Sequence, residues 1–312
     1  NDTVILSALT KDDVVKGGDG VDTLVLAAGT TYSATENAGV GVSGFEVLAS
    51  AGAVSQNMKG LAENTITVAA LAGAGTSLVA QESAITSVVG AYSGSVNVGL
   101  ATDGTADALA VSLGLVSGAS SASLTLDAVD IEALTVVSQG ADGNVLTLDD
   151  DTAGTLTVDS ASVADTDLKS ITILGDKNLT VTHSGDDSAL ASIDASGFTG
   201  NTLTVTASSS EAAMTVDASG AYSANITAGK GADTITVGDG GTANANTVNG
   251  GDGADTIVAG AGDDTLNAGD DGGSVTAGAG DDTVSSGDGA DTIVLGDGDD
   301  SVTDSGAGND VI

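Results

Sequence analysis

The chain has 312 residues, 41% of them apolar but only 2% aromatic, and its 44 acidic residues against six lysines give a formal net charge of −38. This charge argues against nucleic acid and anionic membranes as partners, and the absence of cysteine excludes disulfides, thiolate metal sites and cysteine nucleophiles. A core of Val, Ile, Leu and Ala favours stacked β-strands over a globule, and no apolar run reaches the roughly 18 residues of a membrane span.

Residues 1–120 are predicted to form a β-rich domain. Their clearest phrase is the nonapeptide GGDGVDTLV at Gly17–Val25, which joins a glycine-rich turn to an aliphatic strand. The segment 60–118 is rich in Ala, Gly, Ser and Val, and a short alanine-rich helix at Leu78–Val89 is the alternative to strands there. Asn1–Ile5 resembles the second half of the nonapeptide, and the sequence stops at the equivalent place, so we expect it to be part of a longer polypeptide.

Residues 121–227 lack the nonapeptide but repeat a triplet of aliphatic, threonine and aliphatic residues. Examples are Leu134–Val136, Ile171–Ile173 and Leu203–Val205, with Asp, Gly, Ser or Asn between the triplets. This alternation predicts half-buried strands separated by polar turns. We therefore predict an irregular β-solenoid, a fold that hides sheet edges along most of its length.

Residues 228–312 consist of nonapeptides. Further copies start at Ala228 and Ser305, a stretched copy spans Val237–Asn249, and six copies in strict register start nine residues apart, at Gly250, Ala259, Ala268, Ala277, Ser286 and Leu295. Glycines at the second and fourth positions permit turns that L-residues avoid, and the aliphatic eighth residue points inward from a short strand. The segment has 17 Asp, no Glu and one Lys, which fits tight turns that hold a metal better than a solvated acidic face.

This series resembles the repeats-in-toxin (RTX) nonapeptide G-G-x-G-x-D-x-U-x, in which U is a large aliphatic residue. The resemblance implies an all-β protein, with a right-handed parallel β-roll or β-solenoid over 228–312 and a less regular β-rich region before it. It also implies that multiple Ca²⁺ ions lie between turns two repeats apart, held by the sixth-position aspartate and by backbone carbonyls. A further implication is export of the unfolded chain by a type I secretion system, with the signal outside this sequence.

The metal-binding residues implied by the resemblance are the sixth-position aspartates and the glycines of their turns. The aspartates are Asp22, Asp233, Asp255, Asp264, Asp282, Asp291, Asp300 and Asp310. The glycines are Gly229, Gly231, Gly251, Gly253, Gly260, Gly262, Gly278, Gly280, Gly287, Gly289, Gly296 and Gly298. Two repeats have Gly273 and Asn246 in place of the sixth-position aspartate. The calcium sites that would use these positions are therefore either in doubt or rebuilt with Asp270 and Asp271 as ligands. The alternative is that these aspartates only form turns and bind no ion.

The sequence offers few parts for catalysis. His183 is the only histidine, so zinc sites of the H-E-x-x-H type and sites with several histidines are excluded. It follows a predicted strand without a G-x-S-x-G motif, which favours a solvated or turn-packing histidine over a catalytic one. Carboxylate pairs such as Asp186–Asp187 and Asp263–Asp264 fall in turns, where ion binding or solvation fits better than glycoside hydrolysis. We therefore expect no enzyme activity.

Three short phrases, at Gly17–Leu26, Val42–Leu48 and Ile193–Gly200, look like parts of the RTX-bearing surface-layer (S-layer) proteins and large type I secreted surface proteins of Gram-negative bacteria. This resemblance implies an extracellular, cell-surface structural protein that folds on binding Ca²⁺ and self-associates into a lattice or fibre. Anchoring to cell-surface polysaccharide would then depend on a part outside this sequence. The alternative function is a secretion and folding module, or a stalk, of a larger RTX enzyme or adhesin.

Overall fold

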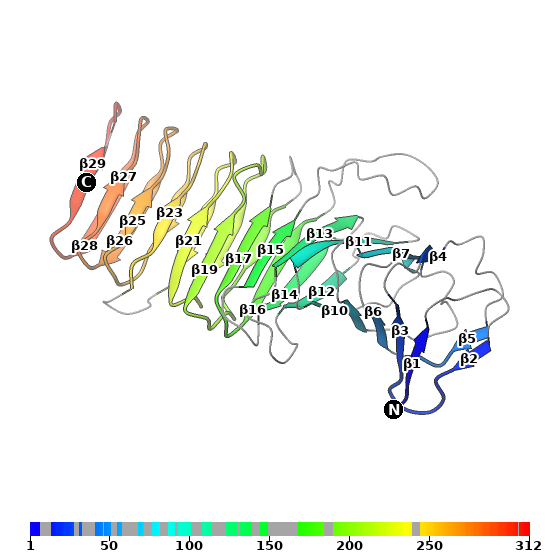
Figure 1. Ribbon diagram of the computed structural model, residues 1–312. Helices are drawn as coiled ribbons and strands as arrows, with labels where there is room; N and C mark the ends of the chain where they lie inside the picture. Colours follow the sequence, from blue (N-terminus) through cyan, green and yellow to red (C-terminus); the bar gives the residue numbers. More distant parts are fainter. Residues whose placement is uncertain are drawn as a thin grey trace. The chain divides into compact units, whose positions relative to one another are not determined.

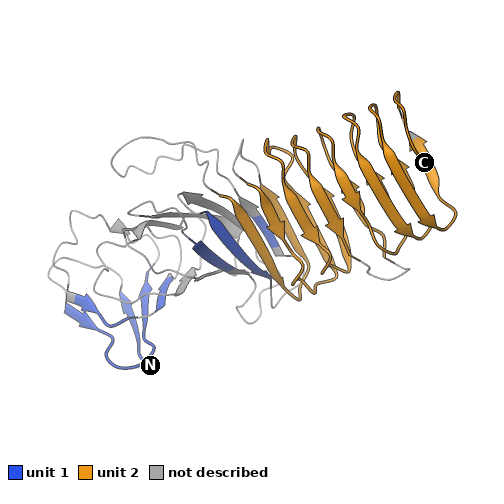
Figure 2. Cartoon of the chain, turned by 180° about the vertical axis from the view of Figure 1, so that it is seen from behind, with its two compact units in different colours: residues 1–165 blue, residues 166–312 orange. Residues whose placement is uncertain are grey.

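The computed structural model divides into two compact units, residues 1–165 and 166–312 (Figure 2). The residues that it describes are 1–6, 14–27, 31–32, 41–45, 47–50, 55–57, 68–71, 76–81, 87–90, 93–100, 108–113, 123–129, 132–138, 144–148, 168–183, 190–238, 244–304 and 306–312. The division into three segments at residues 120 and 227, which follows the type of repeat, stays a prediction.

The first unit consists of parallel strands in two sheets and one small strand pair. One sheet has the order β1-β3-β6-β8-β10-β12-β14, and the other has the order β4-β7-β9-β11-β13-β15. The strands of the first sheet are β1 (Thr3–Leu6), β3 (Thr23–Leu26), β6 (Val47–Ser50), β8 (Val68–Leu71), β10 (Ser87–Gly90), β12 (Ala108–Leu113) and β14 (Ala133–Ser138). Those of the second are β4 (Thr31–Tyr32), β7 (Ser55–Asn57), β9 (Thr76–Gln81), β11 (Ser93–Leu100), β13 (Ser123–Val129) and β15 (Asn144–Leu148). The separate pair is β2 (Val14–Lys16) with β5 (Gly41–Ser43).

The alternative of an alanine-rich helix at Leu78–Val89 is wrong. Its ends lie in β9 and β10, and each of these strands pairs with parallel neighbours on both sides. The backbone donors and acceptors of these residues are therefore used between strands. Pairing across the sheet overrides the local helix propensity of alanine, as tertiary context commonly does.

The second unit is a regular two-sheet solenoid (Figure 1). The sheet called here the even sheet contains β16 (Ser170–Gly175), β18 (Ser192–Asp194), β20 (Thr215–Ala218), β22 (Thr234–Val237), β24 (Thr256–Val258), β26 (Ser274–Ala279) and β28 (Thr292–Asp297), in that order. The odd sheet contains β17 (Leu179–His183), β19 (Thr202–Thr206), β21 (Ser223–Thr227), β23 (Thr247–Asn249), β25 (Thr265–Asn267), β27 (Thr283–Ser285) and β29 (Ser301–Asp304). The chain passes from one sheet to the other at every turn.

The core of the second unit is a set of aliphatic columns. In the even sheet the eighth-position residues Ile235, Ile257, Val275 and Ile293 pair in register from strand to strand, and each is at most 2% exposed. Val248, Leu266 and Val284 form the matching column of the odd sheet. Because successive side chains of a strand point to opposite faces, the threonines beside them face outward. The predicted inward direction of the eighth position is confirmed.

Coil length varies along the unit while the strand register is kept. The step between equivalent residues is 18 residues from Asp264 to Asp282, but 22 residues from Asp233 to Asp255. In the odd sheet, Thr247 lies near the end of the stretched copy. It still pairs with Asn225 of the preceding coil and with Thr265 of the following coil. The additional residues of the longer coils therefore fall outside the paired strands.

All regular elements in the described part of the chain are β-strands, and nearly all of them belong to the two parallel sheets. The predicted all-β parallel solenoid is therefore confirmed. Within the same residues, no helix has the length and hydropathy required for a membrane span. Leu156–Val158, a further triplet of aliphatic, threonine and aliphatic residues for which a strand is predicted, lies outside the described residues.

Replacing Ile257 with alanine is expected to lower the free energy of unfolding by about 2–5 kcal/mol, because it leaves a cavity in a buried column. Ile257 is 0% exposed and its neighbour Val258 is 38% exposed, so Val258→Ala is the matched control. The control should change stability by less than about 0.5 kcal/mol. Urea denaturation in millimolar calcium, followed by circular dichroism, measures both variants. Equal losses in the two would contradict the assignment of the core.

Candidate metal sites in two stacks of turns

The nonapeptide turns of the second unit lie on one another in two stacks. The first turn stack contains the turns at 229–233, 251–255, 269–273, 287–291 and 306–310, and its first four turns lead into strands of the even sheet. The second turn stack contains Asn246 and the turns at 260–264, 278–282 and 296–300, which lead into the odd sheet. Because the strands are parallel and in register, equivalent turn residues recur once per coil.

The sixth-position side chains form a ladder in each stack. The Oδ1 atom of each accepts a hydrogen bond from the backbone N–H of the equivalent residue one coil earlier. In the first stack the pairs are Met214 N to Asp233 at 2.8 Å, Asp233 N to Asp255 at 2.7 Å, Gly273 N to Asp291 at 2.6 Å and Asp291 N to Asp310 at 3.2 Å. In the second stack they are Ala224 N to Asn246 at 2.9 Å, Asn246 N to Asp264 at 2.7 Å, Asp264 N to Asp282 at 2.8 Å and Asp282 N to Asp300 at 3.0 Å.

The second carboxylate oxygen of these aspartates is the unusual atom. Asp255, Asp264, Asp282 and Asp291 are 0–1% exposed, and no hydrogen-bond donor among the described residues reaches their buried Oδ2 atoms. In Asp233, which is equally buried, Oδ2 accepts from Gly229 N at 3.2 Å. A buried anionic oxygen without a donor costs more than the roughly 1–3 kcal/mol of a neutral polar group. These oxygens therefore fit a cation.

Glycine allows the backbone of one turn to lie against a carbonyl oxygen of the turn one coil earlier. Gly253 has a φ of +109°, and a Cβ atom there would clash with the carbonyl oxygen of Gly231. Gly298 has a φ of +147°, and its Cβ would clash with the carbonyl oxygen of Gly280. Carbonyl and carboxylate oxygens are the ligands that calcium takes in proteins. The donor set of the stacked turns therefore fits Ca²⁺.

Most of the other predicted turn glycines also adopt the left-handed region. Their φ angles lie between +70° and +139° at Gly251, Gly262, Gly278, Gly280, Gly287, Gly289 and Gly296. Three predicted glycines, Gly229, Gly231 and Gly260, do not have a positive φ. At Gly229 and Gly231 the need for glycine is steric instead, because a Cβ atom would clash with the carbonyl oxygens of Ser210 and Ala212.

The two repeats without a sixth-position aspartate change the ladders in different ways. Gly273 donates its N–H to Asp291 but brings no carboxylate, while the exposed Asp271 of the same turn accepts from Gly253 N at 3.0 Å through Oδ2. Asn246 keeps the acceptor and adds a donor, because its Nδ2 lies 3.0 Å from Oδ1 of Asp264. A rebuilt calcium site that uses Asp270 and Asp271 stays a prediction.

Burial shifts the protonation of the ladder aspartates. Desolvation raises the pKa of Asp255 to about 7 and that of Asp264 to about 6, from an ordinary value of 3.8. It also raises the pKa of Asp233 and Asp282. Neighbouring carboxylates add to the shift, with Asp282 acting on Asp264 and Asp300 acting on Asp282. A cation at these oxygens therefore competes with protons near neutral pH.

A further acidic column runs along the second stack on its exposed side. Asp263 accepts from the N–H of Asp281 at 2.9 Å, and Asp281 accepts from the N–H of Asp299 at 2.8 Å, in both cases through Oδ1. These fifth-position residues were not predicted from the sequence to form a column. The signal that could have found them is the Asp-Asp doublet that recurs every 18 residues at Asp263–Asp264 and Asp281–Asp282.

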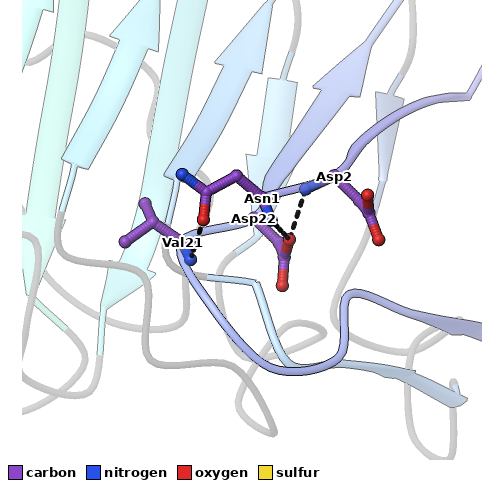
Figure 3. A network of polar contacts seen from close by, with 4 residues as sticks. All are labelled: Asn1, Asp2, Val21 and Asp22. Carbon is purple, nitrogen blue, oxygen red and sulfur yellow. Dashed lines mark hydrogen bonds and ion pairs between the residues drawn. The ribbon is translucent and has the colours of Figure 1, made fainter.

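The isolated repeat of the first unit has the same turn chemistry (Figure 3). Asp22 is 0% exposed, and its Oδ1 accepts from the backbone N–H of Asp2, which lies 20 residues earlier. The side-chain oxygen of Asn1 accepts from Val21 N at 3.0 Å, and the amino group of Asn1 lies 3.6 Å from Asp22 Oδ1. Gly18 and Gly20 have φ angles of +106° and +127°. This turn therefore belongs to the same structural class as the two stacks.

The structure places the predicted aspartates together in these ladders, although Asp300 and Asp310 are only half-buried. No three side chains of His, Cys, Asp or Glu within the described ranges converge on one point, so carboxylates alone do not make a metal site there. An ion in either stack would also need the carbonyl oxygens of the turns. Whether each predicted residue is a ligand stays a prediction.

Parallel coils joined by glycine and aspartate turns, with carboxylate oxygens buried in the stacks, define a β-roll. The family model of the RTX calcium-binding nonapeptide repeat matches the chain at residues 5–31, 220–240, 241–275 and 273–302. The chain therefore carries RTX calcium-binding repeats, both in the C-terminal series and around the isolated copy. Repeats of this family bind calcium and are typical of secreted proteins. No curated protein and no solved structure matches the chain.

Replacing Asp282 with asparagine is expected to lower the apparent calcium affinity by about tenfold, or roughly 1.4 kcal/mol. The amide can still accept the N–H of Asp264, but it removes the negative charge of the buried Oδ2. Asp297 is exposed, and its side chain is part of neither the ladder nor the exposed acidic column. Asp297→Asn removes the same charge and should shift affinity by less than about twofold. Calcium titration followed by circular dichroism compares the two variants. A tenfold loss in Asp297→Asn as well would indicate a general effect of net charge and would contradict the role of Asp282.

Without calcium, the stacks are expected to be more stable at about pH 4 than at about pH 8. A carboxyl whose pKa is raised on folding favours the folded state while it is protonated. This contribution is complete below the ordinary value of 3.8 and is lost as pH rises through about 6 for Asp264 and about 7 for Asp255. Calcium binding should consequently release protons over this interval and tighten as pH rises. Calorimetric titration at about pH 5 and pH 7.5 tests this, and equal affinity with no proton release would contradict it.

Proposed function

We propose that this chain is a calcium-dependent extracellular structural protein, and that it serves as an S-layer subunit which folds and assembles on binding Ca²⁺ after type I secretion. The observation that carries the proposal is the set of buried Oδ2 atoms of Asp255, Asp264, Asp282 and Asp291, which no described donor reaches. A protein that stacks such groups needs cations in order to be stable. Calcium at millimolar concentration outside the cell supplies them.

The mechanism is ion-linked folding. At low calcium the 17 aspartates between 228 and 312 repel one another, and this segment cannot offset the entropy cost of ordering its backbone. The groups that would hold Ca²⁺ are the Oδ2 atoms of the ladder aspartates and the carbonyl groups of the turn glycines. Calcium supplies positive charge between coils. With a Kd of about 0.1–1 mM, each site filled at 1 mM calcium adds about 0.4–1.4 kcal/mol, and neighbouring coils reinforce one another.

A structural role is supported by the chemistry that the chain carries. Its only histidine, His183, is the last residue of β17 and is 2% exposed, which fits the turn-packing interpretation. The outward positions of the strands are mostly Thr, Ser and Asn, as at Thr247, Thr265 and Thr283. The ladder aspartates are used in repeated structure and not in one cleft. We therefore propose that the chain is not an enzyme.

Surface assembly is supported by the charge of the molecule. A formal net charge of −38 keeps copies apart unless cations bridge them, and the exposed column Asp263, Asp281 and Asp299 offers carboxylates for such bridges. Assembly would then depend on the same calcium concentration that folds the chain. Both steps would take place outside the cell.

Addition of about 2 mM calcium to the full chain is expected to raise its β-sheet signal and to produce sheets or fibres, because the ion both folds the coils and neutralises their surfaces. Circular dichroism and negative-stain electron microscopy, with calcium and with chelator, measure the two effects. A complete β-sheet signal in excess chelator would contradict ion-linked folding. Folded monomers in calcium would instead favour a module or stalk of a larger RTX protein over an S-layer subunit.

A further inference from the structure

The coils that precede the nonapeptide series close their turns with apolar side chains. These leading coils are the described residues 168–183 and 190–227. At their turns Leu190 and Phe198 are 0% exposed, Met214 is 2% exposed and Ala221 is 3% exposed. In the aspartate coils, residues 250–304, glycine and aspartate fill the corresponding turns. Burial of apolar surface, which needs no ion, therefore holds the ends of the leading coils.

Two aspartates of the leading coils obtain their donors from their own turns. Oδ1 of Asp194 accepts from the backbone N and the Oγ of Ser196 at 3.0 and 2.6 Å. Asp217, its register partner in the next coil, accepts from the same two groups of Ser219 at 3.0 and 2.5 Å. These hydrogen bonds lower the pKa of Asp194, opposite to the shift in the aspartate coils. Both carboxylates thus obtain hydrogen-bond donors without a cation.

The junction between the two kinds of coil uses protein cations and amides. In the first turn stack Lys230 occupies the third position, where the next repeats have Asp252 and Asp270, and its Nζ lies 2.8 Å from Oε1 of Glu211 in the preceding coil. In the second stack the amide of Asn246 donates to Asp264 at 3.0 Å. An ammonium group and an amide therefore each give a carboxylate at the junction an additional donor, Glu211 through Oε1 and Asp264 through Oδ1, while Oδ2 of Asp264 stays without a described donor.

We infer that the leading coils fold without calcium and act as a template on which the aspartate coils order, one coil at a time, when calcium binds. Strands β22 and β23 at the junction then present formed edges to β24 and β25 before the first ion arrives. Only nearest-neighbour coils interact in a solenoid, so an ordered first coil removes the cost of starting the next. The inference rests on the calcium-linked folding proposed above and adds a starting point to it.

Hydrogen exchange of the full chain, measured by mass spectrometry, tests this template. In chelator, amides of β19 and β21 should be protected while those of β25, β27 and β29 exchange, and calcium should protect both groups. If both groups exchange in chelator and both are protected in calcium, the template is overturned but calcium-linked folding is not. Protection of both groups in chelator would overturn calcium-linked folding, and the template with it.

A variant in the leading coils should change the calcium response of distant repeats. Phe198→Ala removes buried packing but no predicted calcium ligand, and it should raise the calcium concentration that half-protects β27 and β29 by more than about threefold. Tyr222 is 50% exposed, so Tyr222→Ala is the matched control and should leave that midpoint unchanged. An unchanged midpoint in Phe198→Ala, although β19 has lost its protection in chelator, would overturn the template.

A milder variant at the junction provides a second test if Phe198→Ala does not fold. Asn246→Asp removes the amide that donates to Asp264 and adds a like charge beside it, so protection of β23 should become dependent on calcium. Asn249→Asp makes the same charge change at an exposed position of β23 and is the control. Equal protection of β23 in chelator for wild type and Asn246→Asp would contradict the role of this junction.

Discussion

The stability of the nonapeptide coils depends on the second oxygen of a buried carboxylate. One oxygen of each ladder aspartate joins its coil to the backbone of the coil before it, as in the contact of Asp264 N with Asp282 at 2.8 Å. In Asp255, Asp264, Asp282 and Asp291 the other oxygen is buried by the same stacking, beyond the reach of any described donor. In these four side chains, hydrogen bonding between coils therefore brings with it a buried oxygen that fits a cation.

The chain meets the same geometric requirement, closure of a parallel coil, in three chemical ways. In the leading coils, buried apolar side chains such as Phe198 fill the turns, and Asp194 accepts hydrogen bonds from its own turn. At the junction, the amide of Asn246 donates to an aspartate and Lys230 pairs with a glutamate. In the last coils, glycine and aspartate form the turns. In the even sheet the strand ladder continues through all three without a change in register, so the backbone fold is common to them and the chemistry differs only in the turns.

The sequence predicted the parts of this structure that are encoded within one repeat. The repeat pattern itself predicted the buried eighth position, and its resemblance to the RTX nonapeptide predicted the parallel coils and the alignment of the sixth-position aspartates. It could not predict features that arise only when coils stack, such as the amide of Asn246 donating to Asp264, the exposed column of Asp263 and Asp281, and the absence of a positive φ at Gly229. The helix alternative at Leu78–Val89 failed for the same reason, since strand neighbours decide the conformation there.

The variable coil length has a consequence for how such a molecule can change. Strand pairing at Asn225, Thr247 and Thr265 holds across coils of 22 and 18 residues, so extra sequence enters between the strands without disturbing them. Growth by duplication adds a complete coil, whereas a short insertion only enlarges one corner of the solenoid. Such corners are natural places for peptide display, because a foreign segment there leaves the ladders above and below it intact.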